Sequence, residues 1–280
     1  MLARALNLVR DGLIALAYPQ DCRLCGRTVE SFNDGVTCDR CWRDSSITKV
    51  FTEPLCAKCG LPLPAVSAFA QADDSVSNEG MNSDALSAPA IESRRLCGRC
   101  ATLPFSAARA CGAYSGAIEA NVLFLKSHPH LCRRLRMIIS ETFSAHRTAL
   151  ESDVVVPVPL HRLRQRERGF NQAKIIAQVL SKRFGLPLDE GLLARTRYTE
   201  MHRAGVDAID RAKSVERAFK IERPKAIKGA TVLLVDDVYT TGSTICAAAT
   251  ALVGAGAQRV SVLTIARVVP SFIRRRAAVD

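Results

Sequence analysis

One stretch of the chain, VLLVDDVYTTGST at residues 232–244, constrains the fold more than any other. Val232 to Val235 have the apolar character of a buried strand, and the residues from Ile245 onward read as a helix. Two acidic residues and a run of threonine, glycine and serine stand between these elements. Because junctions of this kind commonly carry chemistry, we expect a strand, a functional loop and a helix in close succession.

The second half of the chain alternates between strand and helix patterns. Strands are expected at ARACGAYSG, DVVVPVPL, ATVLLVDDV and RVSVLTIARVV. Helical periodicity covers 117–150 with a break at Pro129, then 170–185 with Gly185 as the stop signal, and then 243–256. Strands separated by helices need crossover connections, which give a mainly parallel sheet covered on both faces. The sequence therefore predicts an α/β domain over residues 110–270.

The loop after the third of these strands has the composition of a phosphate site. The N–H groups at a helix N-terminus and the helix macrodipole both favour an anion. Hydroxyl donors and a glycine that permits close approach of the backbone are found at Thr240, Thr241, Gly242, Ser243 and Thr244. The carboxylates of Asp236 and Asp237 would repel a phosphate, so we expect sugar hydroxyls or Mg²⁺ as their partners. A phosphorylated ribose meets both demands, whereas an N-capping aspartate beside a polar loop would explain only one acid.

A basic segment follows the strand DVVVPVPL. It contains Arg162, Arg164, Arg166 and Arg168, whose guanidinium groups could clamp a pyrophosphate. The alternative is a solvated basic loop. The formal net charge of +12 also favours ligands or polymers that carry phosphate.

Eight of the 11 cysteines form four pairs with the same Cys-x-x-Cys spacing. The pairs are Cys22/Cys25, Cys38/Cys41, Cys56/Cys59 and Cys97/Cys100. One such turn brings two thiolates to a Zn²⁺ ion, and two turns complete a tetrahedral structural site. Zinc is favoured over disulfides because no export signal precedes the pairs. The simplest arrangement joins the first two pairs around one zinc and the last two around another, but an interleaved arrangement would use the same residues.

Composition also indicates the organisation of the remaining chain. Residues 1–21 have the pattern of an amphipathic helix, and the cysteine module spans 22–105. Within it, the stretch 64–95 is rich in Ala, Ser and Asp without an apolar stripe, so we expect a disordered insertion. Residues 271–280 form a basic C-terminal tail. No apolar run approaches the roughly 20 residues of a membrane-spanning helix, so we expect no transmembrane segment and a cytoplasmic protein.

The motifs together resemble a known family. VLLVDDVYTTGST is similar to the phosphoribosyl-pyrophosphate (PRPP) signature of the type I phosphoribosyltransferases. With PVPLHR, RGFNQA and the cysteine pairs, the chain resembles the ComF/GntX family from Cys22 to about Arg267, except for the insertion after Leu63. The resemblance implies a type I phosphoribosyltransferase-like parallel sheet flanked by helices, with a small N-terminal zinc-binding module.

The resemblance also implies roles for individual residues. Asp236 and Asp237 would be the catalytic pair and hold the ribose hydroxyls of PRPP, which binds with Mg²⁺, while residues 240–244 would hold its 5′-phosphate. The expected pyrophosphate-binding residues are Lys126, Arg162, Arg164 and Arg168, and those of a flexible loop are Arg195, Arg197 and Arg211.

Three functions fit these expectations. The first is a role in natural competence, in which the protein binds PRPP and handles incoming single-stranded DNA, with the DNA-translocation machinery as a partner. The others are an active phosphoribosyltransferase with an unidentified acceptor and a PRPP sensor without turnover. The positive charge suits DNA, because neutralised phosphates supply most non-specific affinity. The aromatic content of only 5% argues against a dedicated base-stacking platform.

Overall fold

The computed structural model describes residues 20–63 except 45, 47 and 53, residues 96–197 except 99, and residues 218–269. The insertion predicted at 64–95 and the tail predicted at 271–280 lie outside the described residues, as does the predicted N-terminal helix except for residues 20 and 21. The division of the chain into modules at these positions stays a prediction.

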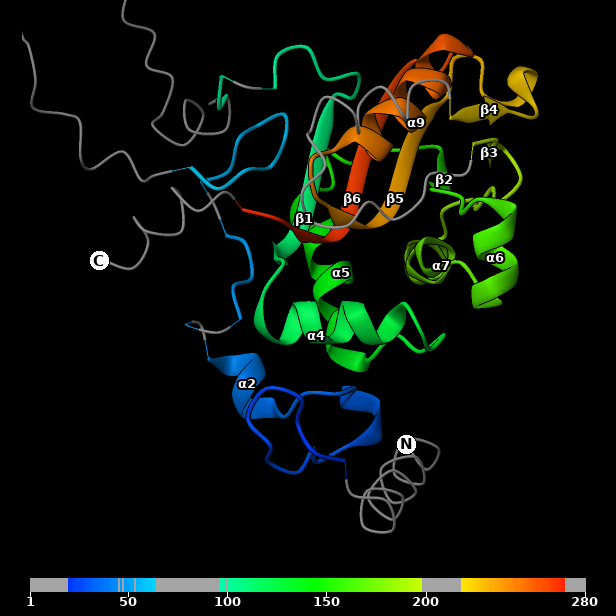
Figure 1. The fold of residues 1–280 in the computed structure, drawn as a ribbon. Helices are drawn as coiled ribbons and strands as arrows, with labels where there is room; N and C mark the ends of the chain where they lie inside the picture. The colour runs from blue at the N-terminus through cyan, green and yellow to red at the C-terminus, as the bar shows by residue number, and fades with distance from the viewer. Residues whose placement is uncertain are drawn as a thin grey trace, which may run out of the picture.

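Four parallel strands form the central sheet in the order β1-β6-β5-β2 (Figure 1). Their bounds are β1 Ala107–Ala113, β2 Val154–Pro157, β5 Thr231–Tyr239 and β6 Arg259–Arg267. Each lies in a stretch with a predicted strand pattern, so the α/β expectation is confirmed. The backbone near Leu188 extends the sheet beyond β2, because Val155 N–H donates to Pro187 and Asp189 N–H donates to Val155.

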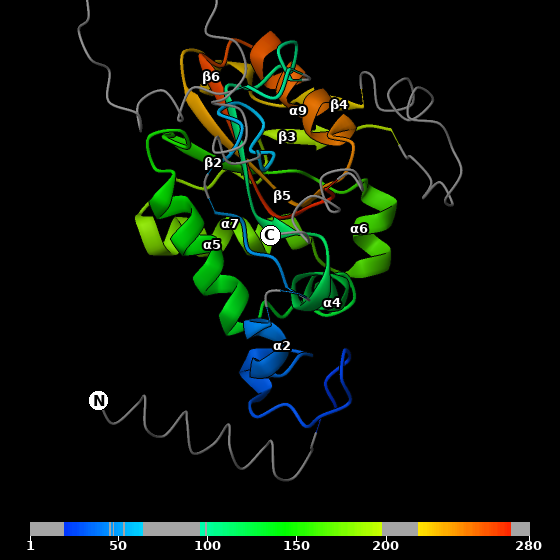
Figure 2. The same ribbon diagram turned by 90° about the vertical axis from the view of Figure 1, so that its left-hand side faces the viewer.

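Helices cover both faces of this sheet (Figure 2). On one face lie α4 (Gly116–Leu125), α5 (Arg133–Ala145) and α7 (Gln172–Phe184). On the other lie α9 (Ser243–Gly254) and a small antiparallel pair, β3 (Leu193–Arg195) with β4 (Phe219–Ile221). The residues that the structure describes also include the short helices η1 (Phe32–Asp34), α2 (Asp39–Arg43), α6 (Arg162–Arg168) and η3 (Pro224–Ala226). The break expected at Pro129 separates α4 from α5.

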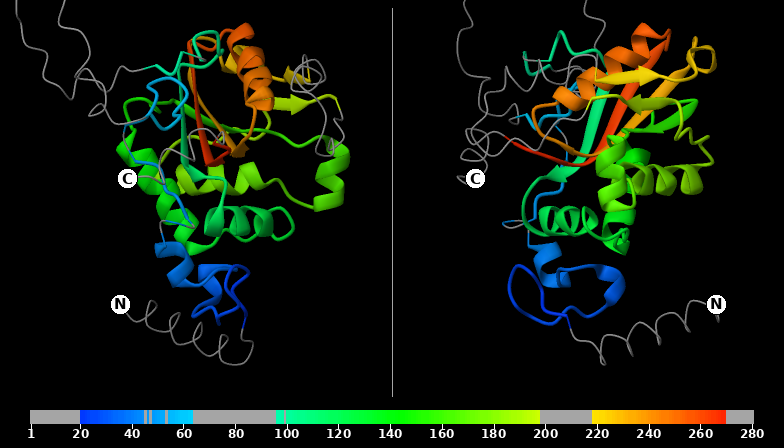
Figure 3. Two further views of the ribbon diagram at one scale, coloured as in Figure 1. Left: turned by 60° about the vertical axis from the view of Figure 1, so that its left-hand side comes forward. Right: turned by 45° about the vertical axis from the view of Figure 1, so that its right-hand side comes forward.

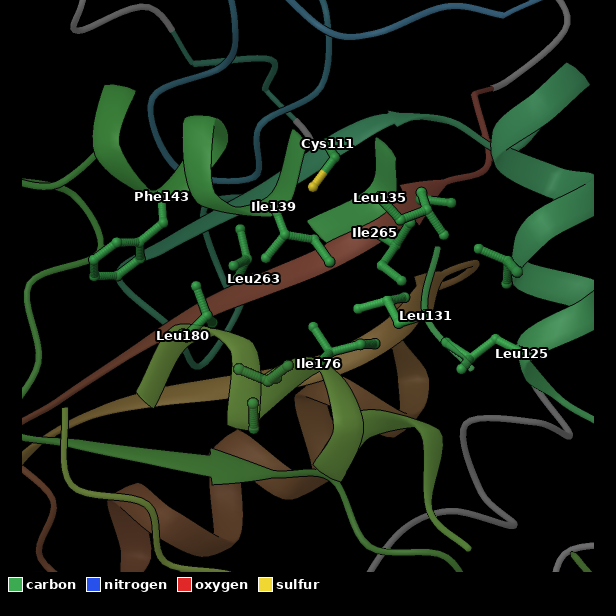
Figure 4. Packing of buried hydrophobic residues seen from close by; sticks show 14 of the residues in the cluster. Cys111, Leu125, Leu131, Leu135, Ile139, Phe143, Ile176, Leu180, Leu263 and Ile265 are labelled. Carbon is green, nitrogen blue, oxygen red and sulfur yellow. The ribbon is translucent and has the colours of Figure 1, made fainter. Parts of the chain in front are cut away.

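The sheet has one core on each face, because alternate residues of a strand point in opposite directions. On β5, Leu233 and Val235 belong to the cluster that contains Ile176 and Leu180 of α7 (Figure 4). Val232 and Leu234 pack instead in the cluster of α9. A strand buried on both faces must be apolar throughout, which explains the unbroken VLLV run before the acids.

The two cysteine-bearing segments dock at different places. The first, around Cys22 to Cys41, lies beyond α4 and away from the sheet (Figure 3). Asn121 of α4 holds it there, because its amide accepts from Val36 N–H and donates to Thr37 Oγ1. The second lies along the outer edge of β1. Ala108 N–H donates to Lys58, and Gly60 packs so closely that a Cβ there would lie 2.3 Å from the Ala108 carbonyl oxygen. This contact covers the otherwise exposed edge strand.

Candidate functional site

The acidic pair lies in the second half of β5, which continues to Tyr239. Asp236 pairs with Thr264 of β6, and Tyr239 pairs with Arg267. The loop that carries the hydroxyl residues therefore begins at Thr240. Since neighbouring residues on a strand point to opposite faces, the two carboxylates meet different elements of the fold.

Asp237 faces the side of α4 and α7 and is only 7% exposed. Its Oδ2 lies 3.8 Å from Nζ of Lys126, the residue that caps the C-terminus of α4. The same oxygen accepts a hydrogen bond from Gln172 Nε2 at 3.4 Å. Gln172 in turn accepts from Arg168 Nη1 at 3.1 Å. A buried carboxylate needs such partners, so Asp237 is held in place by a polar network that ends in two cations.

Asp236 faces the other side, toward Arg195 of β3. Burial and the adjacent Asp237 carboxylate raise the pKa of Asp236 well above its usual value, and the positive charge of Arg195 opposes this shift. Burial in turn lowers the pKa of Arg195. A pKa that burial and a neighbouring like charge shift strongly is frequent at functional sites, so Asp236 is a candidate functional residue.

The loop after β5 turns sharply into α9. Gly242 forms the N-cap of α9 with φ 83°, and a Cβ there would lie 2.6 Å from Oη of Tyr239. Both the left-handed backbone and the close ring explain why only glycine fits. Thr241 Oγ1 and Ser243 Oγ lie 3.1 Å apart at the first turn. The first N–H groups of α9 have no partner within the helix, so this bend can present them to an anion.

The predicted basic segment is a short helix, α6, whose residues are all partly or fully exposed. Arg164 and Arg168 are four residues apart and share one side of α6, because the helix repeats every 3.6 residues. Both reach the cavity described below, whereas Arg162 is exposed and does not line it. The sequence offered no apolar stripe by which this helix could be recognised.

These groups meet in one cavity of about 280 Å³ at the carboxyl ends of β2 and β5. Nine of the predicted site residues line it: Lys126, Arg164, Arg168, Arg195, Asp236, Asp237, Thr240, Gly242 and Thr244. Thr241, Ser243, Arg162 and Arg197 do not, and Arg211 lies outside the described residues. The carboxyl ends of parallel strands are the usual place for ligands in open α/β sheets.

Several residues that line this cavity were not among the predicted site residues. Gln172 is only 6% exposed and connects Arg168 to Asp237. Val158, Pro159 and Leu160 directly follow β2 and form another wall of the cavity. The RGFNQA motif contains Gln172, so its position directly after the N-cap Asn171 of α7 was the available signal.

The eight paired cysteines form two groups, each with sulfur atoms within 4.8 Å of one another. The first tetrad is Cys22, Cys25, Cys38 and Cys41, and the second is Cys56, Cys59, Cys97 and Cys100. This is the sequential pairing that was expected as the simplest, and the interleaved alternative is wrong. In each tetrad a Cys-x-x-Cys turn closes with the same backbone hydrogen bond, from Gly26 to Cys22 and from Gly60 to Cys56, each 2.9 Å long.

The sulfur positions fit tetrahedral zinc. Thiolates bound about 2.3 Å from a zinc ion at tetrahedral corners lie about 3.8 Å apart. The Sγ atoms of Cys22 and Cys41 are 3.8 Å apart and those of Cys25 and Cys38 are 3.6 Å apart. In the second tetrad, Cys56 and Cys100 are separated by 3.5 Å, as are Cys59 and Cys97. The two Cys₄ groups therefore point to two structural zinc sites.

Comparison with known proteins agrees with this architecture. Residues 125–274 match the phosphoribosyl transferase domain, and residues 13–75 match the double zinc ribbon domain. The chain therefore belongs to the phosphoribosyl transferase domain family. The zinc ribbon match ends before Cys97 and Cys100, which complete the second tetrad from beyond the insertion.

Its relatives include proteins of competence and DNA utilization. The chain is 33% identical over 138 residues to competence protein F of Haemophilus influenzae. The aligned region covers 49% of this chain and 59% of that protein. The chain is 29% identical over 259 residues to DNA utilization protein YhgH of Escherichia coli O157:H7. This aligned region covers 90% of this chain and 99% of YhgH. The chain thus matches little more than half the length of competence protein F.

Among solved structures, glutamine PRPP amidotransferase from B. subtilis, complexed with ADP and GMP, overlaps with a TM-score of 0.31 at 25% identity. The overlap covers 46% of this chain and 26% of that one, and the fold assignment rests instead on the sheet and the domain match. Within the described residues, no helix is long and apolar enough to cross a membrane.

Proposed function

We propose that the cavity at the end of β5 binds PRPP or a related phosphoribosyl ligand together with Mg²⁺. The observation that carries this proposal is the convergence of both acids, the glycine-containing bend and four cationic side chains on one cavity. Each part matches a different part of such a ligand. The bend before α9 suits the 5′-phosphate, the carboxylates suit ribose hydroxyls or the metal, and the cations suit the pyrophosphate.

The arrangement also supports a proposal for which bond would break, the C1–O bond between the ribose and the pyrophosphate. Arg164 and Arg168 extend from α6 on one side of the cavity, and the phosphate bend lies at the N-terminus of α9. A ligand held at both ends would place its C1 between them. Positive charge around the pyrophosphate stabilises the negative charge that develops as the C1–O bond breaks, and Mg²⁺ bound to the ligand would add to this effect.

A biological role in handling DNA is favoured by a separate observation, the similarity to proteins named for competence and DNA utilization. We propose that the protein acts in competence-linked uptake or use of single-stranded DNA, in the cytoplasm, with the DNA-translocation machinery as a partner. Its net charge of +12 supports contact with a polyanion. Binding of PRPP or a related phosphoribosyl ligand at the cavity would then control that role, with or without turnover.

Two measurements separate these alternatives. Incubation with PRPP, Mg²⁺ and a panel of nitrogenous acceptors, followed by assay of released pyrophosphate, distinguishes an active transferase from a sensor. Titration of fluorescent single-stranded DNA at several salt concentrations tests the DNA role. A slope of log K against log salt near zero would contradict phosphate-based DNA binding.

A further inference from the structure

The side chain of Arg267, at the last position of β6, connects the second tetrad with the bend before α9. Its Nη1 donates a hydrogen bond to the backbone oxygen of Cys59, and its Nη2 lies 3.8 Å from Cys59 Sγ. Its guanidinium carbon lies 4.2 Å from the centre of the Tyr239 ring. Arg267 therefore contacts a cysteine of the second tetrad and an aromatic residue of β5 at the same time.

Tyr239 connects Arg267 to the bend before α9, because its ring contacts Gly242. Tyr239 is 5% exposed, and its ring lies directly against Gly242, so that no Cβ could be placed between them. Phe105 packs edge-on against the same ring, with centroids 6.4 Å apart. Tyr239 and Arg267 also pair across the sheet, and Val268 N–H donates to the Tyr239 oxygen at 2.9 Å. The position of the ring fixes where the backbone at Gly242 can lie.

The negative charge of a zinc-loaded tetrad would attract the guanidinium group of Arg267. Four thiolates around a Zn²⁺ ion leave a net charge of −2, and cationic or N–H donors to the sulfur atoms stabilise such centres. The planar guanidinium can donate to sulfur and stack on a ring together, which a lysine cannot do. A zinc ion would hold the four sulfur atoms of this tetrad together, so its loss would free the Cys59 sulfur and backbone oxygen that Arg267 contacts.

We propose that Arg267 is a positioning residue that couples zinc binding at the second tetrad to the shape of the phosphate-binding bend. In this arrangement the second zinc sets the affinity of the cavity for its ligand. This inference rests on the proposed function, because the coupling is read through ligand binding. It concerns only the second tetrad, since the first docks on α4 through Asn121.

Arg109 offers a matched control. Its Nη1 also donates to the second cysteine segment, at the Ala57 oxygen 3.1 Å away, and it is 7% exposed. The same Nη1 also donates to the backbone oxygen of Ala108. Loss of either arginine loosens the docking of the segment, and loss of Arg267 also removes the guanidinium group that lies over the Tyr239 ring.

The test is calorimetric titration of the zinc-loaded full chain with PRPP and Mg²⁺. Arg267→Met is expected to raise Kd at least tenfold, whereas Arg109→Met changes it less than twofold. Tyr239→Phe, which keeps the ring against Gly242, is expected to bind as wild type does, and Tyr239→Leu to bind as weakly as Arg267→Met. Equal affinity of wild type and Arg267→Met would overturn the coupling and leave the proposed function intact. No binding by wild type would overturn both.

If the variants fail to fold, a measurement on the wild-type protein alone can still test the coupling. Coupling between two sites is reciprocal, so the ligand must strengthen zinc binding by the factor by which zinc strengthens ligand binding. Equilibrium competition with a zinc chelator is expected to show one zinc equivalent retained at least tenfold more tightly when PRPP and Mg²⁺ are saturating. Retention of both equivalents unchanged would overturn the coupling.

Discussion

The ammonium group of Lys126 lies 3.8 Å from Oδ2 of Asp237, and this pair joins α4 to β5 at the wall of the cavity. Lys126 is the C-cap of a helix whose buried face packs in the sheet core, so the backbone holds its position. The pair is long for an ion pair, which leaves the ammonium group available to a phosphate oxygen as well.

Replacement of this lysine tests that role. Lys126→Met should raise Kd for PRPP with Mg²⁺ about tenfold, equivalent to about 1.4 kcal/mol, because a charge-assisted contact is lost. Lys174→Met is the control, since Lys174 pairs with Glu190 at 2.6 Å on the exposed side of α7. Calorimetric titration of both variants with PRPP and Mg²⁺ measures the two Kd values. Equal affinities for the two variants would count against Lys126 as a ligand contact.

A second prediction concerns Gly242. Gly242→Ala should abolish measurable ligand binding, because the Cβ would strike the Tyr239 ring. It should also destabilise the fold by about 1–3 kcal/mol, since the residue must keep a positive φ. Gly185→Ala shares the positive φ, at 69°, but has open space around its Cα. That control should cost stability with no loss of affinity in thermal melts and titrations, and a Gly242→Ala protein that binds normally would contradict the account.

The acid pair leads to a prediction about stability and pH. The folded state raises the pKa of Asp236 above its usual value of 3.8, through burial and the Asp237 charge. The folded chain thus holds this proton more tightly than the unfolded chain. Its stabilising contribution is complete below pH 3.8 and is lost as the pH rises through the raised pKa.

Asp236→Asn should therefore melt at a higher temperature than wild type at pH 8, while the difference shrinks as the pH falls toward 4. The shift should be roughly 2–4 °C for each kcal/mol relieved. The amide oxygen can still accept the 2.9 Å hydrogen bond from Asp237 N–H, so the local structure is kept. Calorimetric melts across this pH range provide the measurement. A variant less stable than wild type at pH 8 would refute the assigned cause.

The cysteines outside the tetrads give a chemical prediction. Burial raises the pKa of Cys111 to about 12 and that of Cys132 to about 11. Since the thiolate is the reactive form, both should resist iodoacetamide at pH 8 in the zinc-loaded protein. Mass spectrometry should find two zinc ions per chain before chelation, and alkylation of the tetrad cysteines only after it. Fast alkylation of Cys111 in the zinc-loaded state would contradict this assignment.

The parts that the sequence predicted are those set by local pattern. The VLLV run indicated a strand buried on both faces, and Gly185 indicated the end of α7, whose C-cap has φ 69°. By contrast, α6 has no buried residue, so no periodicity marked it. The strands β3 and β4 contain three residues each, too few for a recognisable alternation.

The site was predictable in composition but not in geometry. The residue types pointed to a phosphorylated sugar. Strand alternation puts Asp236 and Asp237 on opposite faces, but the elements that each carboxylate meets depend on the sheet order, which the sequence does not reveal. The role of Gln172 depends on the approach of α7 to β5, a contact between distant parts of the chain. The grouping of cysteines across the insertion is also a through-space property.

Titration of the zinc-loaded protein with PRPP and Mg²⁺, compared with an Asp236→Asn, Asp237→Asn double variant, tests the central claim most directly. The account predicts one ligand per wild-type chain and no detectable binding by the double variant, with two zinc ions retained in both proteins. Equal affinity of the two proteins for PRPP would contradict it.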